Sequence, residues 1–121
     1  MYKRQGYADP YNRGTYPWGR EDGELLDHYR AVTALRRDHP VLARGEYAAE
    51  AYGPHVYGCR RWDGEETIRV LVNRGLFEHE RVTVAAPAPT AHYAINGAEW
   101  TGAGESLTVE LPPLSAIVLF D

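Results

Sequence analysis

The sequence has 121 residues, of which 44% are hydrophobic and 25% are charged, so its size and composition fit one globular domain with a single core. Thirteen basic residues stand against 17 acidic ones, and this mild acidic balance argues against a nucleic-acid partner, because phosphate binding needs clustered Lys and Arg. The single cysteine, Cys59, excludes an internal disulfide and favours a reducing compartment, which we expect to be the cytoplasm. No apolar run reaches the roughly 18 residues of a membrane span, so we expect no membrane contact.

Residues 1–21 are predicted to form an irregular loop, because glycine and proline recur too often for a helix or a strand. The loop is rich in aromatic residues, namely Tyr2, Tyr7, Tyr11, Tyr16 and Trp18. Polar side chains that suit sugar hydroxyls follow or precede these rings in the sequence: Asp9, Asn12 and Arg13. A purely local role is also open, in which Asp9-Pro10 starts a turn and Arg13 pairs with Asp9.

Residues 22–38 are predicted to form a helix, with Asp22 as its N-cap and Pro40 ending it. Apolar residues recur at helical spacing and form one stripe, made of Leu25, Tyr29, Val32 and Leu35. An apolar stripe of this kind needs a partner surface.

After Pro40 the hydrophobic period changes to two, which indicates strands. We expect seven or eight short strands, at 46–52, 55–62, 66–73, 80–86, 92–96, 99–100, 106–111 and 115–121. The predicted fold is mainly β: an antiparallel Greek-key β-sandwich over residues 41–121, preceded by a loop and one helix over residues 1–40. Leu107, Val109 and Leu111 are expected to point inward, and Cys59 is expected to be inward and inert.

The segment from Gly6 to Gly45, "GYADPYNRGTYPWGREDGELLDHYRAVTALRRDHPVLARG", resembles the end of the catalytic barrel in the α-amylase family of glycoside hydrolases. It is most similar to the neopullulanase, cyclomaltodextrinase and maltogenic amylase branch, in which a "DPxNRxxYPW" segment precedes a helix and then a C-terminal β-sandwich. The closing "SLTVELPPLSAIVLFD" resembles the end of that sandwich more loosely. The resemblance implies that residues 1–40 are the last loop and helix of a (β/α)8 barrel.

By this resemblance, Asp9 and Arg13 match residues that contact the glucan on its donor side in the parent enzyme. Tyr16 and Trp18 match packing or platform residues, and Tyr11 is a further possible platform. Gly14 departs from the family, whose members often carry Arg or Glu there.

The resemblance places the catalytic carboxylates on barrel strands upstream of this sequence, so we assign no catalytic residue to the chain. The remaining acidic pairs, Glu65/Glu66 and Glu78/Glu80, are expected to be solvated strand ends. The histidines show no metal-like spacing, and neither a metal nor a cofactor is expected.

The sequence therefore predicts a non-catalytic, structural C-terminal domain of an α-glucan-hydrolysing enzyme, which would meet α-glucan only within that parent. Its expected partner is the catalytic barrel, or a second copy through the apolar helix face. A free-standing carbohydrate-binding sandwich and a protein-interaction domain that does not bind sugar stay open as alternatives.

Overall fold

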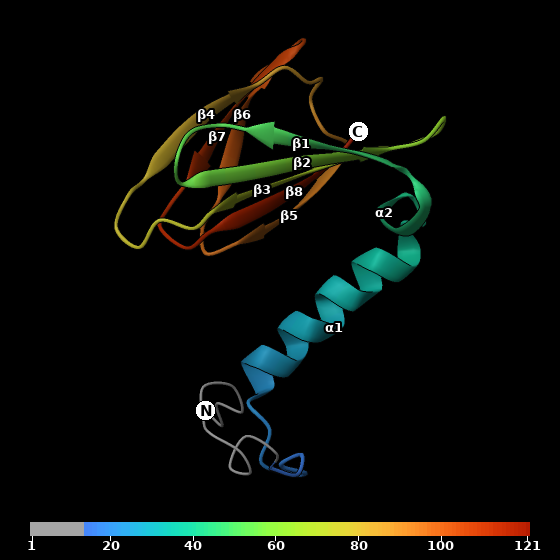
Figure 1. Cartoon of the computed structure of the whole chain (residues 1–121), viewed down its shortest axis with the longest axis vertical. Coiled ribbons are helices and arrows are strands. Elements are labelled where there is room, and N and C mark those ends of the chain that lie inside the picture. The colour runs from blue at the N-terminus through green and yellow to red at the C-terminus, as the bar shows by residue number, and fades with distance from the viewer. Residues whose placement is uncertain (1–13) are drawn as a thin grey trace. The chain divides into compact units, whose positions relative to one another are not determined.

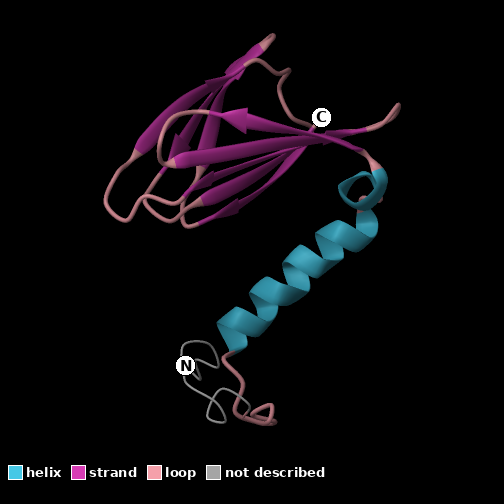
Figure 2. Cartoon of the chain, viewed as in Figure 1, coloured by secondary structure: helices cyan, strands magenta, loops and turns pink. Residues whose placement is uncertain are grey.

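The computed structural model describes residues 14–121 and divides the chain into two compact units, residues up to Asp38 and His39–Asp121. Figure 2 shows that the first contains loop and helix, whereas strands dominate the second. Within the described residues no helix is both long enough and apolar enough to cross a membrane.

The first unit contains the predicted helix, α1 (Gly23–Asp38). Asp22 is its N-cap: the Oδ1 atom of Asp22 accepts a hydrogen bond from the backbone N–H of Leu25 at 3.1 Å. The apolar stripe is present but incompletely covered, because Leu25 is 42% exposed and Tyr29 is 60% exposed. The predicted helix and its cap are confirmed, and no residue of the helix is buried.

The second unit is an antiparallel β-sandwich, as predicted (Figure 1). Its eight strands are β1 (Glu46–Ala51), β2 (Val56–Trp62), β3 (Thr67–Asn73), β4 (Glu80–Val84), β5 (Ala91–Ile95), β6 (Glu99–Ala103), β7 (Ser106–Leu111) and β8 (Ala116–Phe120). Sheet A has five strands in the order β1-β2-β3-β8-β5, and sheet B has three in the order β4-β7-β6. The chain passes between the sheets after β3, β4, β5 and β7.

A short helix that the sequence did not predict, α2 (Val41–Arg44), leads into β1. It lies at one end of sheet A, where Val41 is 2% exposed and Ile68 of β3 is fully buried. The His39 ring lies over the ring of Phe120 with centroids 4.6 Å apart. The turn of α2 was missed because four residues after a proline give too little periodicity to recognise.

The core lies between the two sheets. Its fully buried members include the predicted Leu107, Val109 and Leu111 of β7, each 0% exposed. On sheet A the core is closed by Leu71 of β3, together with Ile117 and Leu119 of β8.

Cys59 does not point inward, contrary to the prediction. Its neighbour Gly58 is in register with the core residue Leu71, so Cys59 and its register partner Val70 lie on the opposite face of sheet A. The alternation in "VYGCRRW" was assigned to the wrong face because glycine carries no side chain to mark the buried side.

The two outward faces of the sandwich differ in chemistry. The outer face of sheet A carries two rows of uncharged residues: Ala49, Cys59, Val70, Val118 and Tyr93, then Ala51, Tyr57, Val72, Ala116 and Ile95. The outer face of sheet B carries a charged row and a threonine row: Arg81, Glu110 and Glu99, then Thr83, Thr108 and Thr101.

Candidate functional site

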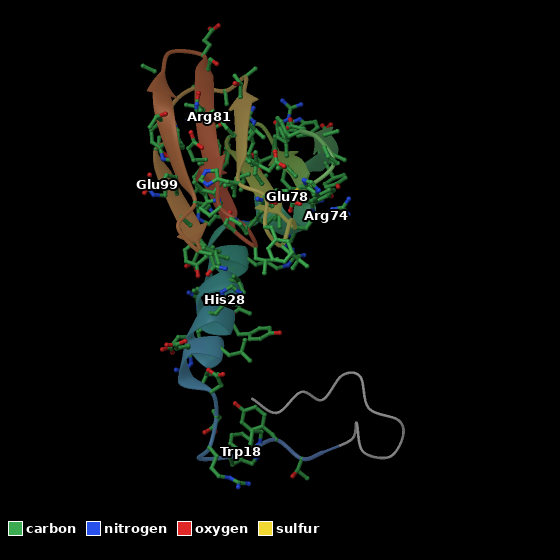
Figure 3. The ribbon with its side chains drawn as sticks, turned by 90° about the vertical axis from the view of Figure 1, so that its left-hand side faces the viewer. Trp18, His28, Arg74, Glu78, Arg81 and Glu99 are labelled. Atoms are coloured by element: carbon green, nitrogen blue, oxygen red, sulfur yellow. The ribbon has the colours of Figure 1, made fainter. Side chains whose placement is uncertain are left out.

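The aromatic loop before α1 was the first predicted site. Asp9, Tyr11 and Arg13 lie outside the described residues. Tyr16 and Trp18 meet edge to face with ring centroids 4.6 Å apart, and Trp18 is 82% exposed. Figure 3 shows Trp18 on the loop that leads into the helix. An exposed indole held against a second ring is a surface on which an apolar sugar face can stack.

Of the four acidic residues in the two pairs, two make contacts with histidine side chains within the sandwich. Glu66 accepts from Nδ1 of His39 at 2.5 Å, and Glu80 pairs with Nδ1 of His55 at 2.9 Å. Both carboxylates are about three-quarters buried, with 26% of each side chain exposed, so they are not the solvated strand ends that we expected. Glu65 and Glu78 are exposed, as expected.

A third carboxylate, Glu110 of β7, contacts an arginine and a histidine side chain on the outer face of sheet B. It accepts a hydrogen bond from Nε of Arg81 and lies 3.1 Å from Nε2 of His79. The hydrogen bond from Arg81 holds the pKa of Glu110 below its ordinary value. Across residues 14–121, no three His, Cys, Asp or Glu side chains come close enough together to hold a metal ion.

Sheet A carries charges on its inner face. Arg69 of β3 pairs with Asp121, and their side chains are only 7% and 11% exposed. Nearby on β2, the guanidinium of Arg60 lies 4.6 Å over the ring of Trp62 and 3.7 Å from Glu50 of β1. Each of these charges has a partner of opposite sign or an aromatic face, which is how buried charges are tolerated.

Tyr52 closes this charged cluster against the core. Its hydroxyl donates to Glu50 at 2.6 Å, and burial together with this bond raises its pKa well above the usual value. Its ring occupies the space over Gly58, where an added Cβ would lie 2.5 Å from Cε2 of Tyr52. The Tyr52 phenol therefore keeps its proton at neutral pH and bonds to a carboxylate that also lies 3.7 Å from Nε of Arg60.

A buried asparagine organises the end of the sandwich where β3 finishes. Asn73 is 1% exposed, and its Nδ2 donates to the backbone carbonyls of Glu78, Leu111 and Pro112 at 2.8, 2.9 and 3.1 Å. Its Oδ1 accepts from the N–H of Gly75 at 2.8 Å. The β3–β4 and β7–β8 loops are therefore fixed to one side chain.

These two loops expose three large apolar side chains, which we call the end tip: Leu76, Phe77 and Leu114, exposed by 64%, 86% and 53%. Leu114 has φ of 54°, a left-handed conformation that bulky residues avoid. Its N–H donates to the carbonyl of Gly75 at 3.1 Å, and its carbonyl accepts from Nδ2 of Asn96 at 2.6 Å. Figure 3 labels Arg74 and Glu78, which lie within the first of these loops on either side of Leu76 and Phe77. Sequence reasoning missed the tip, because single apolar residues in loops carry no periodic signal.

The fold and these interactions define a β-sandwich whose acidic and basic groups serve mainly to join its strands. Comparison with known proteins places such a domain in α-amylase-type enzymes. The chain is 29% identical over 120 residues to an amylopullulanase of Thermoanaerobacter thermohydrosulfuricus, a match that covers 88% of the chain and 8% of that relative. It is 27% identical over 121 residues to a cyclomaltodextrinase of Geobacillus thermopakistaniensis, covering 93% of the chain and 20% of the relative. No family model matches the chain.

Solved structures show the same fold. A debranching enzyme from Nostoc punctiforme matches with a TM-score of 0.75 and 24% identity, over 93% of this chain and 24% of that one. An Anoxybacillus α-amylase matches with a TM-score of 0.74 and 22% identity, over 95% of this chain and 26% of that one. The expected resemblance to part of an α-amylase-family enzyme is thus confirmed, and the chain spans between 8% and 26% of the length of these four proteins.

Proposed function

We propose that the chain is the non-catalytic C-terminal domain of an α-glucan-hydrolysing enzyme of the neopullulanase type. The observation that carries this proposal is that four carboxylates of the sandwich are paired with basic side chains. Glu66 and Glu80 pair with histidines, Glu110 pairs with Arg81, and Asp121 pairs with Arg69. Retaining glycosidases need two carboxylates about 5 Å apart that face a substrate, and these face structural partners instead.

The role that fits such a domain is to support the catalytic barrel. The half-exposed stripe of α1 supports this role, since Leu25 and Tyr29 offer apolar surface to a further domain. Asp9 and Arg13 would contact the glucan only within the parent enzyme. On the basis of the single cysteine we also propose a cytoplasmic location.

A second candidate is a free-standing carbohydrate-binding domain, and one observation favours it. Trp18 exposes 82% of its surface beside the ring of Tyr16, which matches the geometry of a sugar-stacking platform. On this alternative the loop alone would bind α-glucan without a barrel.

Titration of the full chain with maltooligosaccharides by calorimetry separates the two candidates. The structural role predicts no saturable heat. Saturable binding that disappears in Tyr11→Ala and Trp18→Ala, but persists in the control Tyr29→Ala on α1, would establish the carbohydrate-binding domain and overturn the structural role. Release of reducing sugar from pullulan by the pure chain would overturn the assignment as non-catalytic.

A further inference from the structure

We propose that Asn96 is a site of spontaneous deamidation, and that its conversion to aspartate or isoaspartate releases Leu114 of the end tip from its left-handed conformation. Asn96 lies in the turn between β5 of sheet A and β6 of sheet B, and Gly97 follows it in the sequence. This inference does not depend on the proposed function, because it uses only this turn and the loop that the turn contacts.

The reaction needs only the chain and water. The backbone nitrogen of Gly97 attacks Cγ of Asn96, so that a new N–Cγ bond forms and the Cγ–Nδ2 bond breaks. The amide nitrogen leaves as ammonia with the proton from Gly97, and a five-membered cyclic imide remains. Water then opens the imide at one of its two carbonyls, which gives either aspartate or isoaspartate, in which the chain continues through the side-chain carbonyl. Either product carries a negative charge at neutral pH.

The turn leaves both reacting groups accessible. Asn96 and Gly97 are exposed, and both adopt the left-handed conformation of an Asn-Gly turn, with φ of 55° and 76°. A Cβ added to Gly97 would meet only Cγ of Pro112, at 3.9 Å, so no neighbouring side chain crowds this position. Within residues 14–121 the N–H of Gly97 has no hydrogen-bond partner, and its attack therefore breaks no backbone bond.

The other two asparagines lack this combination. Asn12 and Asn73 each precede an arginine, whose side chain hinders the approach of the backbone nitrogen in a way that glycine does not. Asn73 is also 1% exposed, and three backbone carbonyls accept hydrogen bonds from its Nδ2. The chain therefore contains its own comparison, between an exposed Asn-Gly pair and a buried Asn-Arg pair.

The carboxamide of Asn96 holds the β7–β8 loop in place. Its Nδ2 donates to the carbonyl of Leu114 at 2.6 Å, and the N–H of Leu114 donates to the carbonyl of Gly75 at 3.1 Å. Leu114 has φ of 54°, and a bulky residue stays in this conformation only where the surrounding contacts hold it there. These two hydrogen bonds, one on each side of Leu114, are such contacts.

Deamidation replaces the donor of Asn96 with a carboxylate. A carboxylate oxygen only accepts hydrogen bonds, so it repels the carbonyl of Leu114 to which Nδ2 donates in the unmodified chain. With one of its two bonds lost, Leu114 can return to a negative φ, and its bond to Gly75 then opens. A chemical change in the β5–β6 turn would thus loosen the β7–β8 loop and the end tip.

Incubation of the full chain in mildly alkaline buffer, followed by peptide mapping with mass spectrometry, tests the reaction. We expect Asn96 to deamidate at least about tenfold faster than Asn12 or Asn73, and an isoaspartyl methyltransferase to label part of the product. The same incubation in urea gives the rate of the unfolded chain. An Asn96 that reacts in urea but stays intact in the native chain would overturn the proposal, because the fold would then block the attack. Faster deamidation at Asn12 or Asn73 would overturn it as well.

The structural consequence is tested with Asn96→Asp, which carries the charge of the product from the start. Exchange of the Leu114 amide hydrogen, measured by NMR, should be at least about tenfold faster in this variant than in the unmodified chain. The control is Ala88→Asp, which adds the same charge in the exposed β4–β5 loop and should leave this exchange unchanged. That loop meets the far end of β8, where the N–H of Thr90 donates to the carbonyl of Phe120. Circular dichroism verifies that both variants are folded. Equal exchange of Leu114 in Asn96→Asp and in the unmodified chain would overturn the proposed release.

Discussion

Sheets A and B of the sandwich present opposite arrangements of polar and apolar residues. Sheet B follows the pattern of a solvated sheet, with Leu107 and Val109 inward and charges and threonines outward. Sheet A carries charges inward, including Arg69, and uncharged residues on the open part of its outer face. The difference shows that membership of one sandwich does not fix the chemistry of both outer faces: charged and threonine side chains line the outer face of sheet B, whereas two uncharged rows line most of the outer face of sheet A.

The largest expected effect concerns the charge buried on the inner face of sheet A. Asp121→Ala leaves the guanidinium of Arg69 buried without its partner, and this should cost about 3–5 kcal/mol of unfolding free energy. Urea denaturation measures the loss. The control Asp27→Ala removes an exposed pair with Arg30 on α1 and should cost less than about 1 kcal/mol. Equal losses in the two variants would show that the inner charge of sheet A is solvated.

The second test compares an inner residue of sheet B with an outer residue of sheet A. Leu107→Ala leaves a cavity at a fully buried site and should lower the free energy of unfolding by about 2–5 kcal/mol. Val70→Ala removes methyl groups from the outer face and should cost about 1 kcal/mol or less in dilute protein. A cost for Val70 as large as that for Leu107 would mean that the outer face of sheet A is covered within a single copy.

A smaller effect is expected on the charged row of sheet B. Glu99 and Glu110 are directly opposite each other on β6 and β7, and like charges in this position destabilise a sheet. Glu99→Arg should therefore raise the unfolding free energy by about 0.2–1 kcal/mol. Glu105→Arg, in the turn between the same strands, makes the same charge change without that register partner. If both substitutions stabilise equally, net charge rather than the row explains the gain.

The smallest effect is the pH dependence of this row. Because the folded pKa of Glu110 lies below its unfolded value of about 4.3, its stabilising contribution is present above that pH and is lost as the pH falls through the folded pKa. Denaturation of the native chain and of Glu110→Gln across the acid range should show a stability difference that shrinks toward low pH. A difference that is constant with pH would assign the effect to packing.

The sequence predicted the elements that have strong local signals. The Asp22 cap and the spaced apolar residues of α1 indicated the helix, and the alternation in β7 indicated both the strand and its buried face. The aromatic loop was also visible from composition, and within it Tyr16 and Trp18 do lie together.

Long-range features were beyond the reach of sequence patterns. Cys59 was placed on the wrong face because Gly58 left the alternation of β2 ambiguous. The pairing of Glu66 with His39 joins residues 27 positions apart, and no local period encodes it. The end tip depends on Asn73 meeting the β7–β8 loop, which only the tertiary fold brings about.

The position of Asn73 has a consequence for proteolysis. The loop that follows it offers trypsin a cleavage site after Arg74 and chymotrypsin one after Phe77, both at the surface. A protease binds several residues of its substrate as an extended strand in its active site. This segment cannot extend while Nδ2 of Asn73 donates to the carbonyl of Glu78 and Oδ1 of Asn73 accepts a hydrogen bond from the N–H of Gly75. The loop that carries Phe77, the most exposed aromatic side chain of the sandwich, should therefore resist digestion for as long as the two sheets stay together.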